Sequence, residues 1–354
     1  MSYKVLARKW RPATFASMLG QDTVIKALQN SLENNRLHHA YLFTGTRGVG
    51  KTTIARIFAK SLNCELGLNK EPCDKCSNCQ AVTNGNFFDM FEVDAASKTG
   101  VEDTREMLES IQFVPSVGRY KILLIDEVHM FSKSSFNALL KSLEEPPKHI
   151  IFMLATTDPQ KLPPTILSRC LQFNLSRLSE QQLADYFCNI LKQENISFET
   201  DGVEQIALAA DGSVRDGLSL LDQAIAYTSG NVSSDAVATM LGTIEDKHIH
   251  DILTHLASNN IDNLLKTIEQ LSLHTTDFSR VLDTIALQLH QISISQLTKT
   301  DNKFKDLFSA EMVQLMYQIA LKSKQDLPLA PTMRIGLEMA LMRMIAFQPA
   351  KKKL

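Results

Sequence analysis

A glycine-rich run of eight residues constrains the fold of this chain more than any other feature. The run consists of Gly45, Thr46, Arg47, Gly48, Val49, Gly50, Lys51 and Thr52. It follows the apolar residues 40–43 and leads into residues 51–62, whose apolar positions have helical spacing. A glycine-rich turn between a strand and a helix lets backbone N–H groups surround phosphate oxygens, and the helix directs its positive end at the same anion. The run therefore predicts a phosphate-binding loop (P-loop) in an α/β fold, in preference to a chance glycine-rich turn.

A second motif supplies the acidic groups that such a loop needs. Residues 122–127 read Ile-Leu-Leu-Ile-Asp-Glu, an apolar strand that ends in two carboxylates. Lys51 would neutralise the β- and γ-phosphates, while Thr52 and Asp126 would hold Mg²⁺. Glu127 would orient and polarise the attacking water. Two acids after a strand also fit a simple helix cap, but together with the loop they predict hydrolysis of a nucleoside triphosphate.

The first half of the chain alternates apolar and helical patterns. Short apolar runs without strict alternation predict strands buried on both faces of a parallel sheet, at residues 40–43, 91–94, 122–125 and 150–155. Helical patterns lie between them, for example at 51–62 and 134–143. This order predicts right-handed βαβ units and a doubly wound sheet.

After about residue 178 we expect only helices. Ser179 with Gln182, and Asp201 with Glu204, fit capping boxes that open two of them. The following helix ends are expected near Asn195, before Gly212, at Ser229 before Gly230, and at Gly242. A small helical domain is thus expected over 178–242, and a further helical one over 243–354. Recurrent methionines in the latter are interpreted as adaptable core: Met312, Met316, Met339, Met342 and Met344.

Four of the six cysteines lie in one short stretch, at Cys64, Cys73, Cys76 and Cys79. Four thiolates can complete a tetrahedral shell around Zn²⁺, with no position left open for catalysis, so a structural zinc site is predicted. An iron–sulfur cluster is the competing metal group. Its motif continues with a further cysteine and a proline, and neither follows Cys79. Cys188 lies apart, in a helical pattern, and is expected in the core.

Composition narrows the function classes. The chain has 354 residues, 44% of them hydrophobic and 21% charged, which excludes disordered and collagen-like classes. The net charge is −2, so any contact with nucleic acid would use a local surface. No apolar run is long enough to cross a bilayer, and residues 1–12 contain no apolar signal region. We expect a cytoplasmic protein with no membrane partner.

Motifs along the whole chain resemble the bacterial DNA polymerase III gamma/tau subunit family. Besides the loop and the four cysteines, they lie at residues 3–12, 19–21, 38–41, 126–129, 168–170 and 212–216. The resemblance implies an AAA+ nucleotide-binding domain with a parallel sheet over 1–177, into which a four-cysteine zinc module is inserted at about 64–79. It also implies a helical lid domain over 178–242 and an all-α collar domain for oligomerisation over 243–354.

The resemblance implies an ATP-driven motor subunit of a clamp loader, acting within the DNA polymerase III holoenzyme, a DNA-directed DNA polymerase complex. This machine places the ring-shaped sliding clamp on primer–template DNA during replication. The expected partners are the other clamp-loader subunits, in a hetero-oligomer expected to be a pentamer, together with the clamp and the DNA. The expected cofactors are ATP, Mg²⁺ and structural Zn²⁺.

Further site residues are implied by position in the family motifs. Thr157 would be the sensor-1 residue near the γ-phosphate, and Arg215 would be sensor 2 on the lid. Arg169 would act in trans, as an arginine finger in the nucleotide site of a neighbouring subunit. Leu19 and residues 7–11 would lie near the adenine.

Simpler interpretations of the two arginines stay open at this point. Arg169 also fits a surface arginine, and Arg215 also fits an ion-pair partner of Asp211 or Asp216.

Two rival functions are less well supported. Another AAA+ activity, such as a branch-migration helicase or an unfoldase, would not explain the cysteine module or the third domain. A scaffold that binds nucleotide without hydrolysing it would not need Lys51, Asp126 and Glu127 together. Because the chain ends at Leu354, we expect the short gamma form or a truncation, without tethering of polymerase and helicase.

Overall fold

The computed structural model describes residues 4–97, 101–228, 230–241, 246–274, 277–298 and 302–347. The chain divides into two compact units, Met1–Val237 and Ala238–Leu354. The helix ends predicted at Ser229 and Gly242 lie outside the described residues. Each unit is described by itself.

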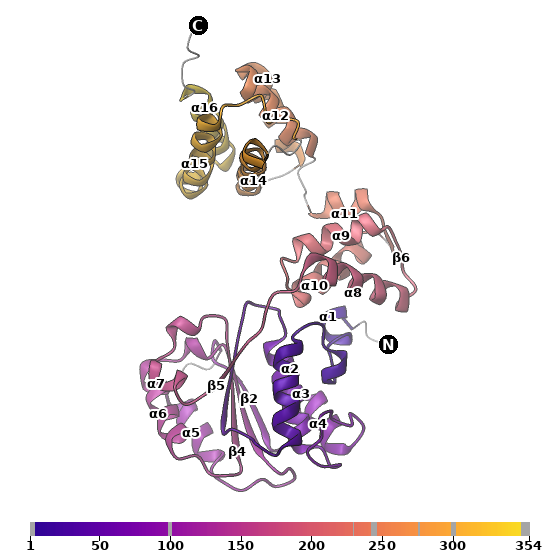
Figure 1. The fold of residues 1–354 in the computed structure, drawn as a ribbon, viewed down its shortest axis with the longest axis vertical. Helices are drawn as coiled ribbons and strands as arrows, with labels where there is room; N and C mark the ends of the chain where they lie inside the picture. Colours follow the sequence, from indigo (N-terminus) through magenta and orange to yellow (C-terminus); the bar gives the residue numbers. More distant parts are fainter. Residues whose placement is uncertain are drawn as a thin grey trace. The chain divides into compact units, whose positions relative to one another are not determined.

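A five-stranded parallel sheet forms the centre of the first unit (Figure 1). Its strands are β1 (Ala40–Thr44), β2 (Met90–Asp94), β3 (Lys121–Asp126), β4 (Ile150–Thr156) and β5 (Leu171–Asn174), in the order β2-β3-β4-β1-β5. The four predicted strands are confirmed as β1 to β4. β5 was missed because it is an edge strand on which only Phe173 is shielded from solvent, so no continuous apolar run indicates it.

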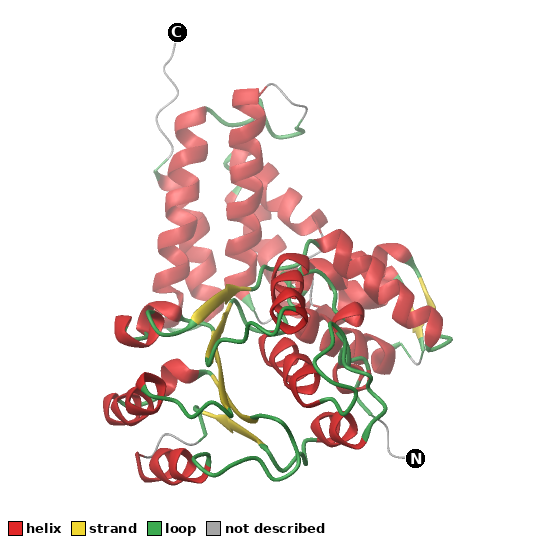
Figure 2. Cartoon of the chain, turned by 60° about the horizontal axis from the view of Figure 1, so that its bottom comes forward, coloured by secondary structure: helices red, strands yellow, loops and turns green. Residues whose placement is uncertain are grey.

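Helices cover both faces of this sheet (Figures 1 and 2). The helices of this region are α1 (Leu6–Lys9), α2 (Asp22–Glu33), α3 (Lys51–Asn63), α4 (Ser77–Asn84), α5 (Val101–Ser110), α6 (Lys133–Glu144) and α7 (Pro164–Leu167), with 3₁₀ turns η1 (Phe15–Ser17), η2 (Val128–Met130) and η3 (Pro159–Lys161). Of these, α1 packs against the later helix Val214–Tyr227. Alternate residues of each central strand enter opposite cores. Leu124 packs with the α2 and α3 side, while Leu123 and Ile125 pack with the α5 and α6 side. Burial on both faces explains why the central strands β1, β3 and β4 are almost continuously apolar.

The lid follows the sheet within the same unit, except for the end of its last helix, which passes the boundary after Val237. It contains α8 (Glu180–Gln193), α9 (Thr200–Ala209), α10 (Val214–Tyr227) and α11 (Ser234–Leu241), with short strands β6 (Ser197–Phe198) and β7 (Asn231–Val232). The capping box of Ser179 and Gln182 is confirmed, and Ser213 caps α10. Cys188 is only half-buried on α8.

Two expectations for the lid were wrong. Two further strands follow residue 178, β6 and β7, which pair in parallel. They were not predicted because a strand of two residues leaves no periodic pattern in the sequence. Asp201 does not cap α9, which begins one residue earlier, after Glu199. The N–H of Glu199 donates to Val232, and its carboxylate accepts from Ser234 N–H at 2.7 Å. Pairing with β7 therefore sets where α9 begins.

The second unit is helical throughout the residues that the structure describes. Its elements are α12 (Asp246–Ser258), α13 (Ile261–His274), α14 (Phe278–Thr298), α15 (Ala310–Asp326), η4 (Leu327–Leu329) and α16 (Met333–Ala346). Met312, Met316 and Met344 lie in its core, as predicted, whereas Met339 is 45% exposed. Among the described helices, none combines the length and the apolar character that spanning a bilayer requires.

Candidate functional site

Parallel strands bring three segments to one edge of the sheet. Thr44, the last residue of β1, pairs with Thr156, the last residue of β4, and β3 lies on the other side of β4. The glycine-rich loop, Asp126–Glu127 and Thr157 therefore all begin at the carboxyl ends of adjacent strands. This is the edge at which open α/β sheets bind their ligands.

The backbone of the loop requires glycine. Gly45, Gly48 and Gly50 have φ of 142°, 77° and 104°. A Cβ on Gly45 would lie 2.5 Å from the carbonyl oxygen of Leu175, and one on Gly48 would lie 1.9 Å from Ser213 Oγ. These glycines thus serve both the left-handed backbone and the close approach of neighbouring segments.

Lys51 is held inside the loop at the start of α3. Its ammonium group donates to the carbonyl oxygens of Gly45 and Thr46, both at 3.0 Å. Burial lowers the pKa of Lys51, whereas the carboxylates of Glu127 and Asp126 act to raise it. The loop thus holds a cation beside its own N–H groups.

Thr52 and Asp126 meet directly. Thr52 Oγ1 donates to Asp126 Oδ2 at 2.7 Å, and the other carboxylate oxygen accepts from the N–H of Glu127 at 3.0 Å. A hydroxyl and a carboxylate at this separation are the oxygen ligands that Mg²⁺ prefers. The residues therefore fit the ion predicted from the sequence.

Glu127 is fixed by the strand next to its own. Thr157 donates to Glu127 Oε2 from its hydroxyl at 2.9 Å and from its N–H at 3.2 Å. His129 Nδ1 lies 3.4 Å from the same oxygen and 2.9 Å from Thr156 Oγ1. The sequence motif contained His129, but only the fold shows that it belongs to this cluster.

The lid contacts the loop through the start of α10. The N–H of Arg215 donates to the carbonyl oxygen of Gly48 at 3.4 Å. Asp211 pairs with Arg177 at 2.5 Å, and Asp216 accepts from Ser213 at 2.8 Å. Among the described residues neither acid pairs with Arg215, so the simpler interpretation of that arginine does not hold.

Arg169 lies apart from this cluster. It pairs with Glu144 at 2.9 Å and donates to the carbonyl oxygen of Thr165 at 2.8 Å. Its side chain is 34% exposed. These contacts lie at the ends of α6 and α7, so the fold does not bring Arg169 to the loop of its own chain.

Residues 7–19 include contacts that no motif indicated. Arg11 Nε donates to Thr53 Oγ1 at 3.3 Å, and burial and the nearby Arg56 lower the pKa of Arg11. Met18 Cε lies 3.1 Å from the position that a Cβ on Gly50 would occupy. Leu19 is half-buried. The N-terminal residues thus border the first turn of α3.

The four predicted cysteines come together in space. Their sulfur atoms all lie within 4.8 Å of one another, and those of Cys73 and Cys79 are 3.9 Å apart. A Zn–S bond of about 2.3 Å gives a tetrahedral S–S edge of about 3.8 Å, so the cluster fits a four-thiolate zinc site. Cys76 caps α4 by accepting from the N–H of Cys79.

The surroundings shift the pKa values of two of these thiols in opposite directions. Backbone N–H groups of Lys75 and Cys76 lower the pKa of Cys73 to about 6. Burial raises the pKa of Cys79 well above its ordinary range. Backbone donors thus favour the thiolate form of Cys73, whereas burial disfavours the thiolate form of Cys79.

Three family models together match nearly all of the chain. The model described as "DNA polymerase III, delta subunit" matches residues 20–179. The model "DNA polymerase III clamp loader subunit, ATPase lid domain" matches 182–230, and "DNA polymerase III subunits gamma and tau domain III" matches 232–354.

Curated relatives match along the whole chain. DNA polymerase III subunit tau/gamma of Haemophilus influenzae is 53% identical over 99% of this chain and 52% of its own length. DNA polymerase III subunit tau of Escherichia coli is 48% identical over 99% of this chain and 56% of its own length. The chain thus spans about half the length of these two relatives.

Solved structures support the fold. A Thermotoga maritima RuvB, described as a Holliday junction branch migration motor, superposes with a TM-score of 0.50 at 20% identity, over 70% of this chain and 79% of that one. At that identity the likeness concerns the architecture alone, which is a P-loop AAA+ sheet with a helical lid.

A shorter relative matches this chain over nearly the full length of both proteins. DNA polymerase III subunit gamma of Buchnera aphidicola subsp. Baizongia pistaciae is 46% identical over 97% of this chain and 97% of its own length. With the gamma and tau domain III model matching its last 123 residues, 232–354, the chain belongs to the DNA polymerase III gamma/tau subunit family.

Proposed function

We propose that this chain binds ATP with Mg²⁺ in the loop 45–52 and hydrolyses it as a motor subunit of a clamp loader. The observation that carries the proposal is the 2.7 Å contact between Thr52 and Asp126, in a member of the gamma/tau family. The contact supports the proposal because its hydroxyl and carboxylate oxygens are groups that Mg²⁺ prefers, and they lie next to a loop whose backbone suits phosphate. Mg²⁺ held there would neutralise charge on the phosphates during transfer.

Lys51 and Glu127 have complementary tasks in this proposal. The Lys51 ammonium would exchange two loop carbonyls for phosphate oxygens, which are anionic and therefore stronger acceptors. Glu127 would orient the attacking water and accept its proton. Thr157, which holds one Glu127 oxygen with two hydrogen bonds, would link the position of that base to the γ-phosphate.

Two arginines would complete the site from elsewhere. Arg215, at the start of α10, would contact the nucleotide from the lid. Arg169 would leave its exposed pair with Glu144 and enter the nucleotide site of a neighbouring subunit. An exposed ion pair contributes at most about 1 kcal/mol to stability, so breaking the pair of Arg169 with Glu144 costs little free energy.

Assembly then makes hydrolysis responsive to partners. We assign residues 1–177 to the nucleotide-binding domain, 178–242 to the lid and 243–354 to the collar that joins the subunits, expected to be five. ATP bound between neighbours would favour the assembly that opens the sliding clamp, and primer–template DNA would trigger hydrolysis and release. ATP can drive this cycle only through different affinities for the two states. The cytoplasmic location stays a prediction.

The test is ATP turnover by the chain assembled with its clamp-loader partners, with and without clamp and primed DNA. Glu127→Gln should lower turnover by about 10²–10⁴ while nucleotide binding is retained, because general-base assistance has that magnitude. Glu145→Gln, the same change at an exposed residue that follows α6, is the matched control.

Two outcomes would contradict the proposal. Turnover that does not depend on Glu127 would indicate a scaffold that binds nucleotide without hydrolysing it. Turnover that is indifferent to clamp and primed DNA would indicate another AAA+ activity.

A further inference from the structure

The N-terminal segment, residues 4–18, is tied to the lid. Leu6 N–H donates to Asp222 on α10 at 2.7 Å. Glu194, which follows α8, accepts from the indole N–H of Trp10 at 2.8 Å and pairs with Lys9 at 2.6 Å. Hydrogen bonds and an ion pair thus attach the first part of the segment to α10 and to the end of α8.

The end of the same segment borders the phosphate-binding loop. Arg11 donates to Thr53 in the first turn of α3, and Met18 lies against Gly50. Between these two residues, Phe15 is 1% exposed and packs in the core that includes Val49 and Ile54. A shift of residues 13–18 would therefore be felt directly at the loop.

The cysteine module, residues 64–79, holds the middle of this segment. Glu71, two residues before Cys73, accepts from Phe15 N–H at 3.0 Å with one carboxylate oxygen. Its other oxygen accepts from Gln29 on α2 at 3.0 Å. One side chain of the module therefore fixes the segment and the helix that follows it.

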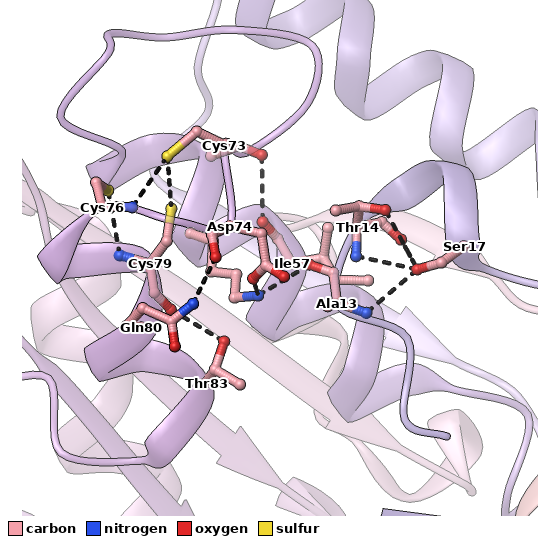
Figure 3. A network of polar contacts seen from close by, with 12 residues as sticks. Ala13, Thr14, Ser17, Ile57, Cys73, Asp74, Cys76, Cys79, Gln80 and Thr83 are labelled. Carbon is pink, nitrogen blue, oxygen red and sulfur yellow. Dashed lines mark hydrogen bonds and ion pairs between the residues drawn. The ribbon is translucent and has the colours of Figure 1, made fainter. Parts of the chain in front are cut away.

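Lys60 makes a second connection, to Ala13 and Asp74, which Figure 3 labels. It lies on α3, nine residues after Lys51, and its side chain is only 3% exposed. Its ammonium donates to the carbonyl oxygen of Ala13 at 2.9 Å and pairs with Asp74, which lies between Cys73 and Cys76. A buried ammonium is stable only when it is paired, so the module, α3 and the segment depend on one another at this point.

We propose that Lys60 and Glu71 are positioning residues for nucleotide binding, through which the metal-loaded cysteine module holds residues 13–18 against α3. The inference rests on the proposed nucleotide binding at the loop. Without metal, residues 64–79 lose the cross-link that orders them. Asp74 and Glu71 then no longer hold their partners, and Arg11 and Met18 lose their fixed places beside the loop.

This arrangement has a thermodynamic consequence that a purely structural zinc site would not have. If metal binding favours the state that binds nucleotide, nucleotide must increase metal affinity by the same factor. Bound nucleotide should therefore slow the loss of zinc to a chelator.

The experiment compares Lys60→Met with Lys70→Met in the full chain. Both changes remove an ammonium that pairs with a carboxylate, but Lys70 pairs with Glu33 on α2, at a site where both side chains are 53% exposed. Zinc content, the dissociation constant for fluorescent ADP, and the rate of zinc transfer to a chelator with and without ADP are measured for each.

Lys60→Met should retain one zinc per chain and bind ADP roughly tenfold more weakly, the scale of one hydrogen bond to a charged group. Bound ADP should no longer slow its zinc loss, whereas Lys70→Met should match the unmodified chain in all three measurements. Unchanged ADP affinity together with ADP-protected zinc in Lys60→Met would overturn the inference.

Two further measurements, on a second variant and on the unmodified chain, separate failure of this inference from failure to fold and from failure of the proposed function. If Lys60→Met does not fold, Glu71→Ala replaces it, with the same expected loss of affinity and coupling and the same contrary result. If the unmodified, zinc-loaded chain binds no ADP, the proposed function itself is overturned, and the inference with it.

Discussion

The two candidate sites of the first unit are assembled in opposite ways. The cysteine site is drawn from residues 64–79, and its sulfur atoms lie within 4.8 Å of one another. The candidate nucleotide site collects a loop after β1, two carboxylates at the end of β3, a threonine after β4 and the start of α10. The first site is local in the sequence, whereas the second exists only because three strands are parallel neighbours.

This difference indicates where each site is vulnerable. A local site depends on its own ligands and on the metal that cross-links them. A site assembled from strand ends depends on the sheet, and in our proposal also on a neighbouring subunit. Four predictions test this contrast, beginning with the largest expected effect.

The first prediction concerns metal removal. Chelation, or Cys79→Ser, should remove an apparent binding free energy on the order of 10 kcal/mol from the module. Hydrogen exchange should then become fast over residues 64–84, while β3 keeps its protection. Unchanged exchange in the module after metal loss would show that it folds without metal, and lost protection in β3 would show that it is not local.

The second prediction concerns the part of the nucleotide site that is expected from another subunit. Arg169→Ala should lower ATP turnover of the assembled complex by about 10³–10⁵, the effect of removing an arginine finger. Nucleotide affinity of the variant's own loop should not change. Arg36→Ala, at an exposed residue, is the control. Turnover equal to that of this control would mean that the site is complete within one chain.

The third prediction separates the two sites within one chain. Lys51→Ala should weaken ATP binding roughly 100-fold or more, since a buried charge partner of the phosphates is removed. Zinc content should stay at that of the unmodified chain because no module contact involves Lys51. Micromolar ATP binding by the variant, measured by titration calorimetry, would count against the assignment of the loop.

The smallest expected effect is at Thr157. Thr157→Val removes one hydroxyl bond to the Glu127 carboxylate, worth about 1.5 kcal/mol, so turnover should fall roughly tenfold. Thr157→Ser, which keeps the hydroxyl, should restore turnover. Equal loss in both variants would indicate that the methyl group, and not the hydrogen bond to Glu127, matters.

Predictions from the sequence were more reliable where many residues of one element share the same property. Strands β1, β3 and β4 were predicted correctly because each is apolar over most of its length, as burial on two faces requires. The edge strand β2 also lies where it was predicted, although Glu92 and Asp94 on it are exposed. β5 was missed because three of its four residues are exposed. The cap predicted at Asp201 failed because pairing of β6 with β7 decides where α9 begins.

Some contacts at the sites had no sequence signal. Lys60 is one lysine on an amphipathic helix, and its partners lie 14 residues ahead at Asp74 and 47 residues back at Ala13. Met18 against Gly50 is likewise a contact between distant segments. No spacing rule connects such pairs, because loop conformation and core packing bring them together.

The sequence by itself determined which residue types are available to the two candidate sites. A glycine-rich loop before a helix, two acids after an apolar strand, and four closely spaced cysteines predict ligands for phosphate, magnesium and zinc, because these groups need particular residue types at short spacing. Only the tertiary structure decided which distant side chains orient them. Thr157 on Glu127 and Lys60 between Ala13 and Asp74 depend on strand order and side-chain packing, which are properties of the whole folded unit.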